Sequence, residues 1–184
     1  MASPVGHTLS GLSLYLLVRG RGAGGRLTVL EAATVVLVSN LPDLDLVPGL
    51  LAGDSSLWHH QVTHSFFFAF IVSVCILLAL VLLKGADKID GRMVIAAGAL
   101  ICLHVGLDFF TEDPHPPHGS QVMWPFSREY YLSPWTFLDR VRREPPNLAM
   151  IGEWALIALK EILIFGPPLL GIWWWRSRGV KREG

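Results

Sequence analysis

The hydrophobic positions of the chain gather into five segments separated by polar stretches. The clearest segment, 65–83, has 19 residues without a charge, which is enough for a helix to cross about 30 Å of hydrocarbon. The first two segments are short for crossing a membrane unaided. The pattern predicts an all-α, polytopic membrane helical bundle of about five spans, which cover residues 5–18, 27–41, 65–83, 93–110 and 148–175.

Composition agrees with a membrane protein. Hydrophobic residues make up 52% of the chain and charged residues 16%, against roughly 25% charged residues in soluble proteins. We expect residues 1–184 to form a single membrane-embedded domain, with 111–147 as an extramembrane loop rich in proline and aromatic residues. The basic residues are scattered beside the predicted spans rather than gathered with aromatic readers, so no nucleic-acid partner is expected.

The basic residues indicate an orientation. If the five spans alternate in direction, ten of the fifteen lysines and arginines fall on one side of the membrane. The positive-inside rule then places this side and the C-terminus in the cytoplasm, and the N-terminus outside, in an inner (cell) membrane. The ten residues are Arg19, Arg21, Arg26, Lys84, Lys88, Arg92, Arg176, Arg178, Lys181 and Arg182.

The stretch 40–65 concentrates chemistry in a chain that is poor in charge. Asp43 and Asp45 offer oxygen ligands, and His59 and His64 offer imidazole nitrogens. Such mixed sets suit zinc, manganese, iron or cobalt better than calcium. The alternative is ordinary turn chemistry, in which the aspartates cap helices and Thr63 caps the next span.

Three further residues are expected at the same, outer end of the bundle. His7 lies at that end of the first span, and His104 and Asp108 lie at that end of the fourth. The latter two are four residues apart, so they share a helix face and can point at one ion. Taken singly, His7 can be an interfacial histidine and the pair a structural hydrogen bond. Together with the 40–65 stretch they predict a metal site at the outer face.

Five motifs occur in order along the chain: G-H-T at 6–8, L-P-D-L-D at 41–45, H-x-x-x-T-H-S at 59–65, H-x-x-x-D at 104–108 and W-P-F-S at 124–127. As a set they resemble the family of membrane-bound, predicted metal-dependent hydrolases of bacteria and archaea, some of them SOS-regulated inner-membrane proteins. The pattern is more distantly similar to zinc-dependent phospholipase C. The resemblance implies metal-ligand roles for His7, Asp43, Asp45, His59, His64, His104 and Asp108.

The size of this ligand set predicts two divalent ions, because a catalytic zinc typically uses three protein ligands and a water. Zinc is the first choice, with manganese or iron as alternatives. A metal-activated water would cleave a phosphoester of a lipid or amphiphilic substrate. Catalytic roles are expected for Asp43, Asp45, His64 and Asp108. One of the three aspartates can serve as the general base, and the sequence does not assign which.

Substrate contacts are expected at Trp124, in an aromatic shelf, at Arg128, whose guanidinium can pair with a phosphate, and at His60. The chain departs from the family pattern at His60, where arginine is common, and over 112–119, where a shorter turn is expected. Arg128 can instead be a solvated arginine beside Glu129. For His115 and His118, a surface or lid role is preferred to that of a further ligand.

The alternative function is a non-enzymatic metal-binding membrane protein or a metal transporter. A transporter needs polar groups at the membrane midplane, and only Lys160, Glu161 and Glu31 are candidates. We expect Lys160 and Glu161 to pair with other spans, with Glu31 as one candidate partner of Lys160. Membrane lipids are the expected partners, and the sequence does not indicate an oligomeric state.

Overall fold

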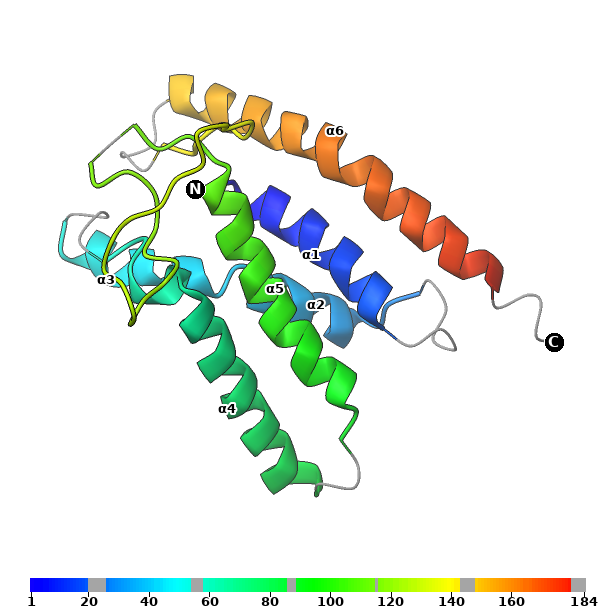
Figure 1. Cartoon of the computed structure of the whole chain (residues 1–184). Coiled ribbons are helices and arrows are strands. Elements are labelled where there is room, and N and C mark those ends of the chain that lie inside the picture. Colours follow the sequence, from blue (N-terminus) through cyan, green and yellow to red (C-terminus); the bar gives the residue numbers. More distant parts are fainter. Residues whose placement is uncertain (20–25, 54–57, 86–88, 115, 143–147, 180–184) are drawn as a thin grey trace.

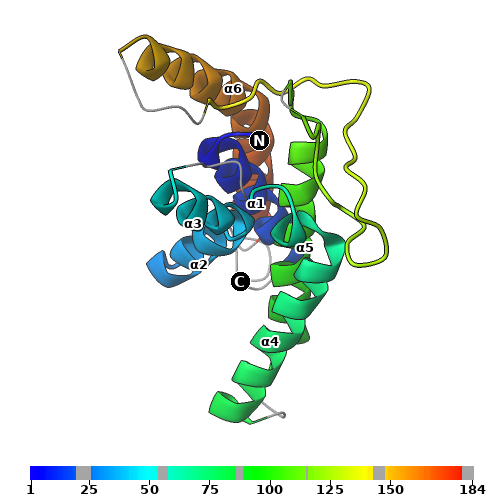
Figure 2. The same ribbon diagram turned by 90° about the vertical axis from the view of Figure 1, so that its left-hand side faces the viewer.

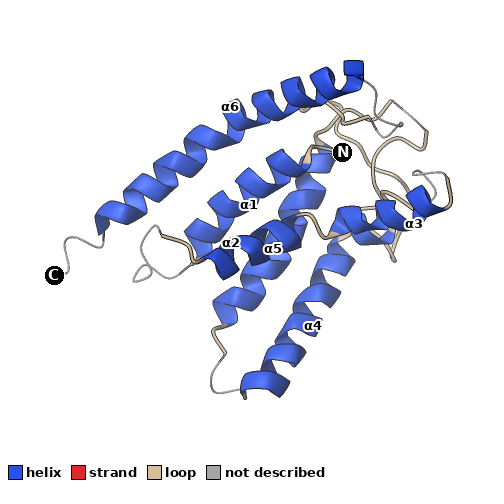
Figure 3. Ribbon diagram, turned by 180° about the vertical axis from the view of Figure 1, so that it is seen from behind, coloured by secondary structure: helices blue, strands red, loops and turns tan. Residues whose placement is uncertain are grey.

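The computed structural model describes residues 1–19, 26–53, 58–85, 89–114, 116–142 and 148–179, and it confirms the all-α prediction (Figures 1 and 3). Within these ranges no strand is present, and extended segments meet only at two isolated bridges, Thr111 with Leu138 and Ser120 with Tyr131. The helices are α1 (Pro4–Val18), α2 (Val29–Ser39), η2 (Pro42–Asp45), α3 (Leu46–Leu51), η3 (Val62–His64), α4 (Phe66–Lys84), α5 (Gly91–Phe109) and α6 (Leu148–Gly179).

Three helices are long and apolar enough to cross a membrane, over Phe66–Leu83, Gly91–Phe109 and Met150–Arg178. At 1.5 Å per residue, α1 and α2 extend only about 22 Å and about 16 Å, short of the roughly 30 Å of a hydrocarbon core. The structure therefore supports three candidate spans rather than five. Helix α6 continues through Pro167 and Pro168.

Local sequence explains where the helices begin. Thr28 and Glu31 form a capping box at the start of α2, each side chain accepting a backbone N–H of the other residue. Ser65 caps α4 by accepting the Phe68 N–H at 3.1 Å, and Asp90 caps α5 by accepting the Arg92 N–H at 2.9 Å. Pro42 follows α2 closely and opens the 3₁₀ turn η2, which carries two of the predicted ligands.

Helix α1 lies centrally and packs against α2, α5 and α6, while α4 packs against α5 (Figures 1 and 2). Small residues allow close approach, as is common between membrane helices. A Cβ added to Gly11 of α1 would lie 2.1 Å from Ser39 Oγ of α2, and one added to Gly98 of α5 would lie 2.5 Å from Ser73 Oγ of α4. Helix α4 is apolar, and only 6% of its Phe66–Leu83 span is buried, as expected for a lipid-facing helix.

The start of α1 is held by a buried carboxylate of α6. Glu161 Oε1 accepts the Ser3 N–H at 2.8 Å, and Oε2 accepts the Gly6 N–H at 3.0 Å and the Ser3 hydroxyl. Glu161 is only 2% exposed. Its expected pairing with another helix is thus present, whereas Lys160 pairs with Asp139 and not with Glu31. Glu31 instead pairs with Arg19, at 3.1 Å.

The N-terminus of α1, the 3₁₀ turns and the loop that follows α5 gather at one end of the molecule, away from the α4–α5 turn and the end of α6 (Figure 1). Backbone hydrogen bonds attach this loop to the region before α4: the Phe66 N–H donates to Val122 O at 3.1 Å, and the Gln121 N–H donates to His60 O at 2.9 Å. Several residues named from the sequence lie outside the described residues, namely Arg21, Lys88, His115, Lys181 and Arg182.

Candidate metal centre

Four ligand atoms from η2, η3 and α5 face one another in the buried end of the bundle. Asp43 Oδ1 lies 3.5 Å from both His64 Nε2 and His104 Nε2, and Asp108 Oδ2 lies 3.2 Å and 3.3 Å from the same two nitrogens. The two nitrogens are 3.3 Å apart. Bonds of 2.0–2.1 Å around a tetrahedral zinc place its ligand atoms about 3.3 Å from each other. The separations therefore match the edges of a tetrahedral metal site.

These four residues meet because three local structures end at the same place. Pro42 starts the turn that carries Asp43, and His64 ends the turn that leads into α4. His104 and Asp108 share a face of α5, as their spacing predicts. The side chains of His64, His104 and Asp108 are fully buried, and that of Asp43 is 10% exposed.

The ring nitrogens that face away from this group are also occupied. His104 Nδ1 lies 2.8 Å from the carbonyl oxygen of Ser39, and His64 Nδ1 lies 3.2 Å from Asp45 Oδ2. Asp45 Oδ1 lies 2.6 Å from His59 Nδ1, and the Thr63 hydroxyl donates to Asp45 Oδ2. Such contacts place the proton on Nδ1 and leave Nε2 as the metal ligand. Asp45, which the sequence predicted as a ligand, thus contacts the Nδ1 atoms of His59 and His64, on the side of each ring away from Nε2.

We expect Asp45→Asn to weaken metal binding about 10- to 100-fold without abolishing it, because outer contacts of this kind contribute that much. Asp43→Asn, which removes a ligand oxygen, is expected to have the larger effect. Competition with a calibrated chelator measures both affinities. Equal losses in the two variants would assign Asp45 to the ligand set.

His7 approaches the group from α1. Its Nε2 lies 3.4 Å from Asp108 Oδ1, and its ring stacks on His104 with centroids 3.7 Å apart. The same Asp108 oxygen accepts the Ala2 N–H at 2.8 Å. All three carboxylates and the four histidines that the sequence predicted to converge, His7, His59, His64 and His104, are therefore brought together at one end of the bundle.

The burial of three carboxylates requires positive charge beside them. Burial raises the pKa of Asp45, but contacts with the His59 and His64 rings outweigh it and hold the pKa at about 2. The Asp43 pKa is likewise lowered, despite burial, by the rings of His104 and His64. Burial in turn lowers the pKa of His64, yet its three carboxylate neighbours raise it well above the ordinary value. A protonated imidazole or a divalent cation supplies the charge.

The polar atoms that face the cluster fit a metal ion. Among the described residues, no hydrogen-bond partner exists for either ring nitrogen of His7, either oxygen of Asp43, or Asp108 Oδ2. A buried polar atom without a partner costs about 1–3 kcal/mol, and a bound cation would offset this cost for the ligand atoms gathered here. Imidazole and carboxylate donors suit a transition-metal dication.

The residues expected to contact substrate differ in position. His60 is buried beside the cluster, with ring centroids 4.0 Å from His59 and 4.9 Å from His64. Trp124 packs edge-on against Phe67 of α4, with centroids 5.7 Å apart. Arg128 is exposed on the loop, and its carbonyl oxygen accepts from the Gln121 side chain at 3.1 Å. Of these three, the structure brings only His60 against the histidine cluster.

Asp113 had no role in the sequence analysis, and Thr63 was considered there only as a helix cap, a place that Ser65 takes in the structure. Asp113 Oδ2 lies 3.4 Å from His60 Nδ1, and Thr63 contacts Asp45. Asp113 lies in the segment 112–119, which departs from the family pattern. That departure was the only sign in the sequence that this segment could take part in the site. His118 is exposed, and its Nδ1 lies 2.8 Å from the Asp113 carbonyl oxygen.

The fold and this cluster define a helical membrane protein with a buried histidine–aspartate centre at one end. More specifically, the chain belongs to the YdjM inner membrane protein family, whose model matches residues 1–176. No curated protein and no solved structure matches the chain. The resemblance seen in the sequence is thus confirmed at the level of an inner membrane protein family.

Proposed function

We propose that this protein is a metal-dependent hydrolase that cleaves a phosphoester of a lipid or an amphiphilic molecule. The observation that carries the proposal is the group Asp43, His64, His104 and Asp108, whose ligand atoms lie 3.2–3.5 Å apart. A divalent ion bound there, with a second beside it, supplies Lewis acidity and a water of lowered pKa. Zinc fits this donor set best, and manganese or iron are alternatives.

The side chains have distinct tasks in this proposal. His64, His104 and Asp108 are fully buried and hold the ion, while Asp43 forms the more accessible edge. A catalytic site needs an open position, and the Asp43 edge is where water and substrate can enter. The second Asp43 oxygen has no hydrogen-bond partner among the described residues, so it can accept a proton as a general base.

Aromatic residues on the loop after α5 support a membrane-borne substrate. Phe126 is 84% exposed and Trp135 is 80% exposed, on the loop that is bonded to the site through Gln121 and His60. Exposed aromatic side chains of this kind favour the membrane–water interface. A lipid head group in the outer leaflet would lie level with the centre, and Arg128 on the same loop can pair with its phosphate.

The proposed orientation has the N-terminus and the site outside and the C-terminus in the cytoplasm. The described basic residues that support it lie at the helix ends remote from the site (Figure 1). Arg19 follows α1, Arg92 lies in the first turn of α5, and Arg176 and Arg178 lie in the last turn of α6. The positive-inside rule assigns these ends to the cytoplasm.

One observation favours the alternative of a metal ion that only stabilises the fold. Four protein ligands complete a tetrahedron, and structural zinc sites are closed in this way. A transporter has less support, because the two ionisable residues in the middle of α6 are engaged: Glu161 with the start of α1 and Lys160 with Asp139.

Hydrolysis by the full chain tests the proposal. Protein purified in detergent is stripped of metal, reloaded with Zn²⁺ or Mn²⁺, and assayed on phospholipid vesicles and soluble phosphodiesters. We expect turnover only in the loaded form, lost in His64→Ala and retained in the matched loop variant His118→Ala. A tightly bound ion without turnover of any ester would support the structural alternative, and metal flux into proteoliposomes would support transport.

A further inference from the structure

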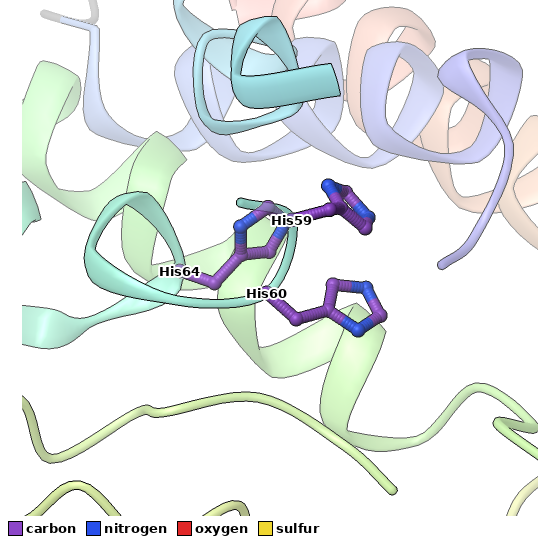
Figure 4. A group of neighbouring side chains, drawn as sticks. All are labelled: His59, His60 and His64. Atoms are coloured by element: carbon purple, nitrogen blue, oxygen red, sulfur yellow. The ribbon is translucent and has the colours of Figure 1, made fainter. Parts of the chain in front are cut away.

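The second cluster of ring nitrogens lies beside the tetrahedral group, in the segment between α3 and α4 (Figure 4). His59, His60 and His64 each offer a ring nitrogen, and these atoms lie within 4.8 Å of one another. All three residues are buried, with 4%, 6% and 0% of their surface exposed. In Figure 4 the His59 and His60 rings extend to the same side of the segment.

Asp113 adds a carboxylate to this cluster from the loop after α5. Its Oδ2 lies 3.4 Å from His60 Nδ1, too long for a good hydrogen bond but equal to the spacing of two ligands on one ion. Both side chains are shielded, at 7% and 14% exposure. The Gly119 N–H donates to the same oxygen at 3.0 Å and fixes the carboxylate in place.

The backbone conformations at His60 and at Gly119 bring the His60 ring and the Asp113 carboxylate together. His60 has a φ of 66°, which non-glycine residues rarely adopt and which recurs where a side chain must be held for function. Its carbonyl oxygen accepts the Gln121 N–H at 2.9 Å, so loop and histidine are tied together. Gly119 has a φ of 89°, and a Cβ there would lie 2.1 Å from the Tyr131 carbonyl oxygen, so the turn beside Asp113 requires glycine.

The ring nitrogens of His59 and His64 face different residues. His59 Nδ1 and His64 Nδ1 both face Asp45, so Nε2 is the atom that each ring presents to a metal. His64 Nε2 faces Asp43 and Asp108 in the tetrahedral group. His59 is the ring that lies against His60, with ring centroids 4.0 Å apart.

We propose that His59, His60 and Asp113 form a second site for a transition-metal dication, adjacent to the first. The proposal rests on the proposed metal centre and extends it by making His60 a ligand rather than a substrate contact. The His60 Nδ1 to Asp113 Oδ2 distance of 3.4 Å is close to the roughly 3.3 Å edge of a tetrahedral site, and the offered nitrogens of His59 and His60 lie within 4.8 Å of each other. The His60 and Asp113 side chains are more exposed than those of His64, His104 and Asp108, so we expect this site to bind its ion more weakly than the tetrahedral group.

Counting bound ions tests the proposal. Full-length protein in detergent is stripped of metal and dialysed against Zn²⁺ at graded free concentrations, and bound zinc is measured by elemental analysis. We expect two ions per chain for the wild type, one tight and one at least tenfold weaker. His60→Arg, which puts a fixed positive charge beside Asp113, and Asp113→Asn are expected to lose only the weaker ion.

Matched controls are Glu112→Gln, an exposed acid next to Asp113, and His118→Ala; both are expected to keep two ions. Circular dichroism verifies that each variant is folded, and Co²⁺ spectra report whether the tetrahedral site is unchanged. A wild type with a single tight ion, or two ions retained in both His60→Arg and Asp113→Asn, would overturn the second site alone. A wild type that binds none would overturn the metal centre as well.

Discussion

Asp108→Asn is expected to empty the proposed metal centre and abolish the proposed hydrolysis. Asp108 Oδ2 lies 3.2 Å and 3.3 Å from the Nε2 atoms of His64 and His104, and Oδ1 lies 3.4 Å from His7 Nε2. The substitution replaces a charged ligand by a neutral amide at a fully buried position. We expect metal affinity to fall by more than the 10- to 100-fold typical of outer contacts. Elemental analysis of the purified variant measures the loss.

The matched control is Asp139→Asn, which changes an exposed aspartate that pairs with Lys160. This variant should keep the metal content and activity of the wild type. Since asparagine can still accept the Ala2 N–H that Asp108 accepts, Asp108→Asn should remain folded. Undiminished metal content in Asp108→Asn would show that the cluster is a set of structural hydrogen bonds.

Much of this centre could be predicted because helix geometry converts spacing into position. The four-residue interval between His104 and Asp108 puts both on one face of α5. The alternation of apolar segments then brought the 40–65 stretch and His7 to the same end. These arguments need only the direction in which each helix runs, and the succession of apolar segments along the chain indicates that direction.

The grouping of the ligands could not be predicted in the same way. Asp43 and Asp45 are two residues apart in a 3₁₀ turn, and nothing in their spacing shows that Asp43 faces His104 while Asp45 faces the far side of His64. Likewise, the sequence separation of 53 residues between His60 and Asp113 hides their contact. Both depend on how a loop folds over the site, which follows from tertiary packing.

The pairing of polar residues within helices was also only partly predictable. Lys160 and Glu161 are adjacent and so lie about 100° apart on α6. This spacing indicates that they face different neighbours, but it does not identify those neighbours. Glu31, which was one candidate partner of Lys160, instead caps its own helix and pairs with Arg19, and Lys160 pairs with Asp139. Glu161 instead serves the start of α1, where Gly6 lacks the side chain that would block it.

Glu161→Leu is therefore expected to destabilise the fold by about 2 kcal/mol or more, because it leaves the two buried donors of Ser3 without an acceptor at about 1–3 kcal/mol each. The Gly6 N–H keeps only its long, 3.5 Å contact with Ser3 Oγ. Unfolding of the protein in detergent measures the change. The neighbouring Lys160→Leu, which removes an exposed ion pair, should cost less than about 1 kcal/mol.

Glu161→Leu should also weaken metal binding, because Glu161 fixes the start of α1. That helix end carries His7 and lies next to Ala2, whose N–H donates to Asp108. A carboxylate at a helix N-terminus is also favoured by the helix dipole, so Glu161→Gln should recover only part of the stability. Equal stability of Glu161→Leu and Lys160→Leu would mean that α1 is held by its apolar contacts alone. A loss of stability without a loss of metal affinity would separate the anchoring of α1 from the assembly of the centre.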